Sequence, residues 1–178
     1  MAGQIVGSIK DGVAQLLFDN EARRNAISID MSRQAADLLE QYQRNPEVRL
    51  LVITGAGDKS FISGADISEF EKTRKDPATA AEYSKISSRM YNLVHDFPKP
   101  TIAKIRGFCF GGGMGLALTG DVLIAGESAK LTQLLSDMEE VAESGRKAIV
   151  FSQWVEPLEV LASTMHQSAW VPLVVHIL

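Results

Sequence analysis

The 178-residue sequence predicts an α/β fold, because short apolar runs alternate along the chain with segments in which apolar residues recur at helical spacing. Glycine and proline mark the ends of most of these segments. The chain is 46% hydrophobic and 22% charged, a balance typical of an ordinary soluble globular protein with a real core. In such a fold, chemistry is expected in the loops that follow strands.

The first part of the chain begins with a hairpin and a helix. Residues 4–20 read as two strands around Asp11 and Gly12, a dipeptide that strongly favours a tight hairpin turn. A segment of helical periodicity follows, and Ser28 or Asp30 is expected to cap it. The elements expected next are, in order, a buried strand over 49–54, a loop with a short turn of helix over 58–70, a long helix capped at Asp76, a strand over 100–107, a glycine turn into a helix over 111–121, and a strand over 122–128.

The character of the sequence changes after residue 128, so the chain is divided into a domain over 1–128 and a tail over 129–178. The tail is expected to form a short αβαβ unit. Its elements are a helix over 129–145, a buried strand over 146–153, a helix over 156–167 and an apolar strand over 171–178.

Three consecutive glycines, Gly111 to Gly113, stand between an apolar strand and a segment that reads as a helix. A helix that begins near Gly112 presents unpartnered backbone N–H groups, and negative charge is stabilised there. Without side chains, a ligand atom can approach these N–H groups directly. The alternative is close packing of the helix against a strand, and the glycines alone leave both readings open.

A second stretch, FISGADISEF over 61–70, also follows an apolar strand, and on its own it indicates a helix cap around Asp66. Together with KPTIAKIRGFCFGGG over 99–113 and DVLIAGESA over 121–129, it resembles the signatures of the crotonase superfamily, also called the enoyl-CoA hydratase/isomerase superfamily. The early stretch NEARRNAIS is similar to that family's first coenzyme A segment. Order and spacing agree over about residues 3–129.

The resemblance implies a spiral of ββα turns, truncated in this chain, that binds acyl-CoA or enoyl-CoA thioesters in lyase or isomerase reactions of fatty acid metabolism. By position, the backbone N–H groups of Ala65 and Gly112 would form an oxyanion hole for a thioester enolate, whose oxygen needs prearranged donors. The thioester is the substrate, and no separate cofactor or metal is implied. The residues that the resemblance assigns to substrate binding are Arg24, Ala26, Ser63, Gly64, Ala65, Asp66, Ile67, Gly111, Gly112 and Gly115. Arg23 is a further candidate for the coenzyme A phosphates, although surface arginines are more often simply solvated.

The resemblance breaks at the two positions where family hydratases carry a glutamate. These positions are Gly115 and Leu135, and neither side chain can exchange a proton. Water addition needs an acid/base group near the reacting carbons, so hydration is not expected. The nearby Glu139, Glu140 and Glu143 read as the solvated face of a helix.

The tail, from about residue 129 to 178, resembles the start of the second lobe of Snf2-type helicases, which predicts a fusion near the SAK tripeptide at 128–130. That lobe's arginine-containing ATP motif and the first lobe with its phosphate loop are missing, so the tail would not be an ATPase alone. The alternative is a divergent crotonase end. The functional rivals are therefore a thioester enzyme, a non-catalytic acyl-CoA-binding remnant and a fragment of a nucleic-acid-linked helicase.

Composition limits the binding partners and the cellular location that are expected of the protein. The formal net charge of −4 does not favour nucleic acid or an anionic membrane, and no apolar run is long enough to span a bilayer. A single cysteine and the absence of a signal-peptide pattern favour a reducing, cytoplasmic location. Cys109, His95, His166 and His176 show no metal-ligand spacing. The family's trimeric assembly makes a homo-oligomer one expectation.

Overall fold

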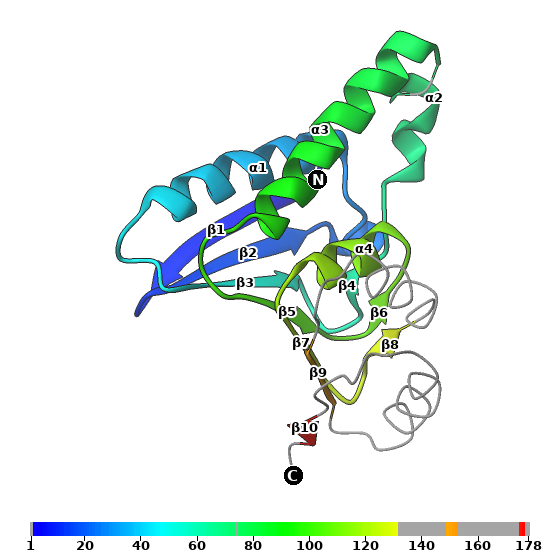
Figure 1. Ribbon diagram of the computed structural model, residues 1–178. Coiled ribbons are helices and arrows are strands. Elements are labelled where there is room, and N and C mark those ends of the chain that lie inside the picture. The colour runs from blue at the N-terminus through cyan, green and yellow to red at the C-terminus, as the bar shows by residue number, and fades with distance from the viewer. Residues whose placement is uncertain (1, 74, 132–148, 153–174, 177–178) are drawn as a thin grey trace, which may run out of the picture.

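The computed structural model describes residues 2–73, 75–131, 149–152 and 175–176, the last two ranges by their backbone alone. These residues form a seven-stranded sheet in the order β1-β2-β3-β5-β7-β9-β10 and a three-stranded sheet in the order β4-β6-β8 (Figure 1). Only β1 and β2 are antiparallel in the described sheets. The strands are β1 (Gln4–Lys10), β2 (Val13–Asp19), β3 (Leu50–Gly55), β4 (Ser60–Ile62), β5 (Thr101–Ile105), β6 (Phe108–Cys109), β7 (Val122–Ala125), β8 (Lys130–Leu131), β9 (Ile149–Ser152) and β10 (Val175–His176).

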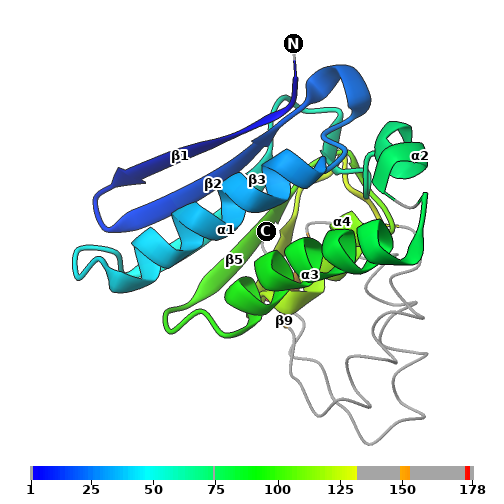
Figure 2. The same cartoon turned by 90° about the horizontal axis from the view of Figure 1, so that it is seen from above.

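Two long helices cover one face of the large sheet and lie side by side across it (Figure 2). Ser28 caps the first of them by accepting a hydrogen bond from Met31 N, and Asp76 forms a capping box with Thr79 at the start of the second. The helices are η1 (Glu21–Arg23), α1 (Ile29–Arg44), η2 (Ile67–Glu69), α2 (Phe70–Thr73), α3 (Pro77–His95) and α4 (Gly112–Thr119).

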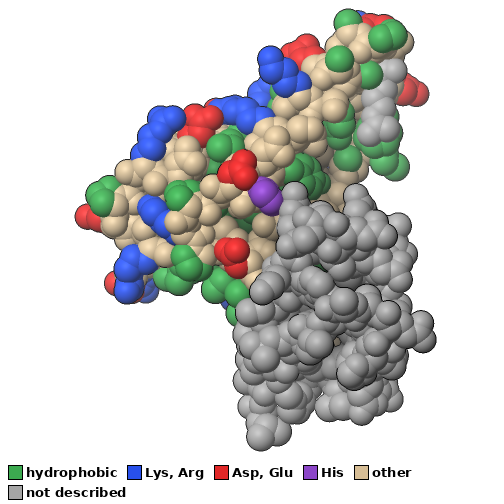
Figure 3. All heavy atoms as spheres, in the orientation of Figure 1, with side chains coloured by type: hydrophobic (Ala, Val, Ile, Leu, Met, Phe, Trp, Pro, Cys, Tyr) green, Lys and Arg blue, Asp and Glu red, His purple; other side chains and the backbone are tan. Residues whose placement is uncertain are grey.

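The main core lies between the large sheet and its helices. Phe18, Leu51 and Ile53 from the strands are buried against Met31 and Leu39 of α1. Such burial contributes roughly 1.5–3 kcal/mol per large apolar side chain. The outer surface of α1 and α3 carries charged side chains of both signs (Figure 3).

Ion pairs tie the outer surfaces of α1 and α3 together. Arg89 of α3 lies 2.6 Å from Glu40 and 3.1 Å from Asp37 of α1. The hydrogen bond with Glu40 raises the pKa of Arg89 above its already high ordinary value. Exposed pairs of this kind stabilise weakly, but here they fix how α3 lies on α1.

The small sheet positions the candidate site. β4 and β6 are parallel neighbours, so their carboxyl ends meet at one edge, and the chain leaves β4 into residues 63–66 and β6 into the glycines before α4. Five of the eight residues of α4 are buried. The two stretches singled out in the sequence therefore emerge side by side.

The predicted hairpin, both long helices and the strands over 49–54, 100–107 and 122–128 are confirmed. Ser60–Ile62 were expected to be loop, and Phe108–Cys109 were assigned to no element, but both stretches are strands. Both stretches are too short to show a strand pattern and are held by pairing with each other.

The predicted helix over 129–145 is wrong at its start. Lys130 and Leu131 pair with Phe108 and Cys109 as strand β8, because the backbone of β6 offers an edge there. Residues 132–145 of that helix, and the predicted helix over 156–167, lie outside the described residues.

The described backbone includes two of the expected tail strands. β9 pairs with β7 in the large sheet and β10 pairs with β9, so this part of the tail shares a sheet with the first domain. The division at residues 128 and 129 stays a prediction. Within the described ranges, no helix is both long and apolar enough to cross a bilayer.

Candidate active site

The first arm of the site is the loop around Ala65. Ile27 N donates to Gly64 O at 2.8 Å, and Asp66 N donates to Ile27 O at 2.8 Å. These two hydrogen bonds fix the peptide groups on both sides of Ala65 as an isolated parallel bridge. The N–H of Ala65 itself donates to no acceptor in the described part of the chain.

Asp66 anchors this arm rather than facing a ligand. Its carboxylate accepts hydrogen bonds from Arg23 Nη1 at 2.6 Å and from Ser68 N and Oγ at 3.0 and 2.7 Å. Burial acts to raise the pKa of Asp66, but hydrogen bonds from Ser68 and Arg23 outweigh it and lower the pKa. The expected helix cap is confirmed, since Asp66 caps η2.

Neighbouring residues of the first arm divide between anchoring and exposure. Ser63 Oγ donates to Arg23 O at 3.3 Å, which ties the arm again to the segment before α1. Arg23 Nη1 also donates to Ser68 Oγ, so its guanidinium is engaged within the chain. Ile67 is 76% exposed. An apolar side chain in this position beside the site is available to a ligand.

The second arm is the glycine turn, and its glycines serve different purposes. Gly111 has φ 48° and ψ −123°, a conformation that side chains do not tolerate, and an added Cβ there would meet nothing within 4 Å. At Gly113 the backbone conformation is ordinary, but a Cβ would overlap the carbonyl oxygen of Ile62 in β4. Close helix–strand packing, one of the two readings left open by the sequence, is met at Gly113, and direct approach of a ligand to the glycine backbone stays a prediction.

Gly112 lies between these two and keeps an N–H with no acceptor among the described residues. Gly113 N donates to Phe110 O at 2.8 Å and Gly115 N to Gly111 O at 3.0 Å, so the turn closes around it. This N–H is the first donor of α4, where the helix dipole is positive.

The two arms meet at the empty side-chain position of Gly112. A Cβ built on Gly112 would lie 3.8 Å from Ala65 N and 3.7 Å from Gly64 Cα. A Cβ on Gly64 would lie 3.5 Å from Gly112 N. Glycine at both positions thus leaves a gap without a side chain beside Gly112, close to two N–H groups that have no acceptor among the described residues. The atom nearest to the missing Cβ is Tyr91 Oη, at 2.8 Å. Such a gap has the chemical character of a receptor for one oxygen carrying negative charge.

Tyr91 of α3 reaches the same place and was not predicted. Its hydroxyl donates to Gly112 O at 2.7 Å, and burial raises its pKa to about 12, with a smaller contribution from Tyr83. A Cβ on Gly115 would lie 3.6 Å from Tyr91 Cε1, an ordinary contact. Helical spacing to the buried Val94 places Tyr91 near an inward face, but no pattern in the sequence says which helix it meets.

The segment expected to line the coenzyme A path joins the small sheet. The guanidinium of Arg24 lies 4.9 Å from the centre of the Phe108 ring, and Lys130 Nζ lies 5.0 Å from the same centre. Buried Asn25 braces the segment by donating to Ser60 O at 2.7 Å, and Ala26 is also buried. Lys130 was not predicted as part of this cluster because it was read as helical.

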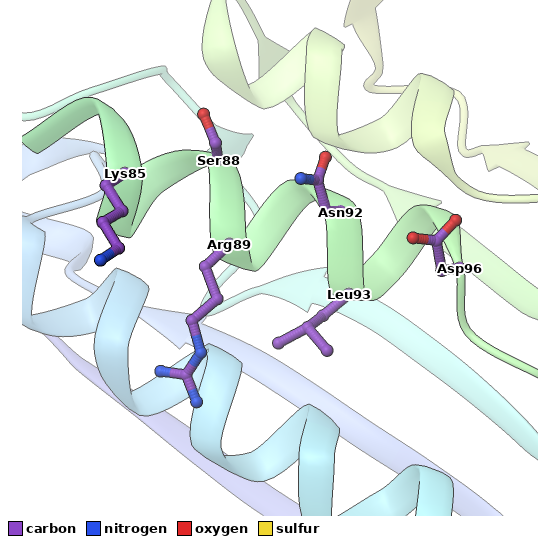
Figure 4. A pocket seen from close by; sticks show the side chains of 6 residues that line it. All are labelled: Lys85, Ser88, Arg89, Asn92, Leu93 and Asp96. Atoms are coloured by element: carbon purple, nitrogen blue, oxygen red, sulfur yellow. The ribbon is translucent and has the colours of Figure 1, made fainter. Parts of the chain in front are cut away.

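Two surface hollows lined by described residues lie elsewhere. One, of about 450 Å³, is lined by α3 and by Asp96 at its C-terminal end, with Arg89 extending toward α1 (Figure 4). Its lining residues are Lys85, Ser88, Arg89, Asn92, Leu93 and Asp96. A second, of about 280 Å³, is also on α3. Neither includes a residue of the gap at Gly112, so neither is the expected thioester site.

The remaining predicted positions are mostly outside the described residues, including Leu135, the three glutamates over 139–143 and His166. Within the described part, no three His, Cys, Asp or Glu side chains are grouped as metal ligands. Cys109 is buried in the core, as expected of a structural cysteine.

Comparison with known proteins gives one consistent family. Residues 8–153 match the family described as Enoyl-CoA hydratase/isomerase. A Crotonyl-CoA hydratase from Syntrophomonas wolfei is 34% identical over 124 residues, which cover 70% of this chain and 47% of that protein. A 1,2-epoxyphenylacetyl-CoA isomerase from Escherichia coli is 29% identical over 143 residues, covering 79% and 54%.

Solved structures agree with this assignment. A putative enoyl-CoA hydratase/isomerase family protein from Hyphomonas neptunium superposes with a TM-score of 0.69 at 33% identity, covering 76% of this chain and 52% of that one. The chain spans about half the length of the curated relatives it matches. On the match over residues 8–153, this chain belongs to the enoyl-CoA hydratase/isomerase family.

Proposed function

We propose that this chain binds acyl-CoA or enoyl-CoA thioesters and stabilises the thioester enolate with the backbone N–H groups of Ala65 and Gly112. The observation that carries the proposal is the gap at Gly112. Two N–H groups that have no acceptor among the described residues lie beside it, and they belong to segments that follow two different strands. Fixed donors aimed at developing charge act without reorganising during the reaction. Removing one donor from a comparable hole costs on the order of 10²–10³ in rate.

The coenzyme A end of the ligand would run along Arg24 and Ala26. Arg24 carries a charge that a phosphate can pair with, and no ion pair within the described residues engages it. Arg23 is the weaker candidate because Asp66 and Ser68 already hold its guanidinium. Ser63 and Gly64 supply the backbone beside the oxyanion donors, which leaves the exposed Ile67 to contact an apolar part of the ligand.

The reaction is not expected to be hydration. Gly115 presents no carboxylate to the gap, and Tyr91 lies against it instead. A neutral phenol does not activate water at neutral pH as a carboxylate does. The same observation supports a second candidate, a protein that binds thioesters without turning them over. A panel of enoyl- and acyl-CoA thioesters separates the two, since turnover of any member excludes the second.

The first experiment is calorimetric titration of the whole chain with coenzyme A, acetyl-CoA and acetoacetyl-CoA. Acetoacetyl-CoA ionises to an enolate more readily than a simple thioester, so an oxyanion hole should bind it more tightly than coenzyme A. Equal affinity for all three would show that the ligand is held without the oxyanion donors. No binding of any of the three would overturn the proposal.

A variant pair isolates the Gly112 donor. Gly112→Pro removes the N–H, and proline is tolerated in a first helical turn, whereas Gly112→Ala keeps the N–H and adds a methyl group in the same place. We expect acetoacetyl-CoA affinity to fall about 100-fold or more in the proline variant and less than about tenfold in the alanine variant. Equal losses in two folded variants would show that space, not the N–H, matters.

The likeness of residues 129–178 to a helicase lobe predicts a nucleic-acid partner, which the net charge of −4 does not favour. A salt-dependent affinity for DNA would support that likeness. If no such affinity is found, the helicase reading is removed and thioester binding is left as the proposed function. For that function we propose a reducing, cytoplasmic setting.

A further inference from the structure

Tyr91 is an ionisable side chain that lies against the first turn of α4. Its hydroxyl donates to Gly112 O at 2.7 Å, and its ring edge lies 3.6 Å from the Cβ position of Gly115. The phenol therefore covers the turn from Gly112 to Gly115, which is the turn that carries the proposed donor.

The hydroxyl also borders the gap itself. A Cβ on Gly112 would lie 2.8 Å from Tyr91 Oη and 3.8 Å from Ala65 N. The phenol and the loop arm therefore both lie close to Gly112, the phenol closer than the loop arm.

The two carboxylates that follow Ala65 most closely in the chain already accept hydrogen bonds within the protein. Asp66 accepts hydrogen bonds from Arg23 and Ser68, and Glu69 Oε2 accepts one from Ile29 N at 2.8 Å. Both hold the loop arm to α1 and its flanking segment. The hydrogen bond of the phenol joins the helix arm to α3.

We propose that Tyr91 is a positioning residue of the oxyanion hole: its hydrogen bond to Gly112 O sets the orientation of the Gly112 backbone, and with it the direction of the second donor. The inference rests on the proposed thioester-binding function and names the side chain that tunes it. The hydroxyl restrains the carbonyl of Gly112, which follows Gly112 Cα in the backbone. Without that restraint, the N–H of Gly112, which precedes Cα, can rotate away from the gap. Binding of a ligand that does not use the oxyanion donors should be untouched.

The test compares two ligands on three proteins. Coenzyme A and acetoacetyl-CoA are titrated into the unmutated chain, Tyr91→Phe and Tyr42→Phe, and the ultraviolet absorbance of the enolate form of bound acetoacetyl-CoA is recorded. Tyr42 is a buried tyrosine of α1 whose hydroxyl donates to Gln15 O at 3.2 Å, and it serves as the matched control. We expect Tyr91→Phe to weaken acetoacetyl-CoA about fivefold and to reduce its enolate fraction, with coenzyme A affinity unchanged. Tyr42→Phe should change neither.

Each outcome bears on the proposal separately. If the unmutated chain binds neither ligand, the proposed function falls, and the inference with it. If it binds both and Tyr91→Phe keeps the same affinities and enolate fraction, the inference alone is overturned. Equal weakening of both ligands would show a merely structural role.

A second variant keeps the test informative if Tyr91→Phe does not fold. Tyr91→Leu also removes the phenol and its hydrogen bond to Gly112 O, and it keeps an apolar side chain at this position of α3. We expect the same selective loss of about fivefold for acetoacetyl-CoA. Retained affinity and enolate fraction in Tyr91→Leu would overturn the inference.

Discussion

The two proposed donors lie at the ends of neighbouring strands, yet they are fixed in different ways. The loop arm at Ala65 is held by residues about forty positions earlier, through the backbone of Ile27 and the side chain of Arg23. The helix arm at Gly112 is held by backbone contact of Gly113 with Ile62 and by Tyr91. One arm depends on polar contacts near the surface and the other on close packing in the interior.

This difference has an energetic consequence. Arg23 is half exposed, with a side-chain accessibility of 53%, so water competes for its contact with Asp66. The backbone of Gly113 faces the carbonyl of Ile62, and neither side of that contact can move aside. We therefore expect the helix arm to tolerate substitution less than the loop arm, although both are proposed to bind the same oxygen.

The largest effect is expected at Gly113. Gly113→Ala would place a methyl group inside the carbonyl of Ile62, and we expect the free energy of unfolding to fall by about 3 kcal/mol or more. Gly111→Ala is the control, since its side chain meets open space and only the positive φ opposes it, at a cost of about 1–2 kcal/mol. Denaturant unfolding of both variants measures the difference. A smaller loss at Gly113 than at Gly111 would contradict the packing argument.

The loop arm should respond to Asp66→Ala. Losing its charged hydrogen bonds should lower the free energy of unfolding by about 2 kcal/mol and weaken acetoacetyl-CoA. Asp76→Ala removes a similar helix-capping aspartate, at the start of α3, and should cost about 1 kcal/mol without affecting the ligand. Thioester affinity that follows stability equally in both variants would show that Asp66 has no local role.

The pH dependence of this pair follows from the lowered pKa of Asp66. The stabilisation it contributes is present above its unfolded-state pKa and is lost as the pH falls through the lower folded-state value. The stability difference between the unmutated chain and Asp66→Ala should therefore shrink in acid. Unfolding curves measured from neutral pH downward test this, and a difference that grows in acid would contradict it.

The comparison of the two arms also shows what the sequence can and cannot predict. Local signals were sufficient to predict the hairpin and the two long helices, because Ser28, Asp76 and the Asp11–Gly12 turn act within a few residues. The resemblance in two separated stretches brought Ala65 and Gly112 together, and the structure places both beside one gap.

Long-range contacts without a local pattern were the ones that sequence reasoning missed. Tyr91 reads as one more residue of a helix until α4 is seen against it, and Lys130 reads as helical until β6 offers it an edge. The short strands β4 and β6 exist only as a pair. Pairing partners far apart in the chain decide these elements, and propensity over two or three residues does not.

A gain of function would sharpen the comparison on the helix arm. Gly115→Glu adds a carboxylate one turn after Gly112, where a Cβ makes only an ordinary contact with Tyr91. A glycine in a helix interior is unfavourable by about 0.8–1 kcal/mol, so the propensity of the helix does not oppose this change.

We expect the unmutated chain not to hydrate crotonyl-CoA and Gly115→Glu to do so at about tenfold its background, equivalent to about 1.4 kcal/mol. One acid/base group acting fully contributes more, but its partner position is Leu135. Loss of the ultraviolet absorbance of crotonyl-CoA reports the reaction, with Gly115→Gln as the uncharged control. Brisk hydration by the unmutated chain would mean that an acid read as a surface residue serves the site.

The smallest expected effect is a pH dependence at Tyr91, and it tests whether the helix arm is as dry as its packing indicates. Burial raises the pKa of this phenol to about 12, whereas in the unfolded chain it titrates near 10. Below pH 10 both states keep the proton, so its stabilising contacts are fully present. As the pH rises from 10 toward 12, the unfolded chain ionises first and the folded state loses stability. Between pH 9 and 11, the unmutated chain should lose about 1 kcal/mol more than Tyr91→Phe. The other titrating groups are common to both proteins and cancel in this difference. Parallel stability curves for the two proteins over this range would show that the phenol is hydrated in the folded state, and would weaken the case that it shapes a water-poor oxyanion site.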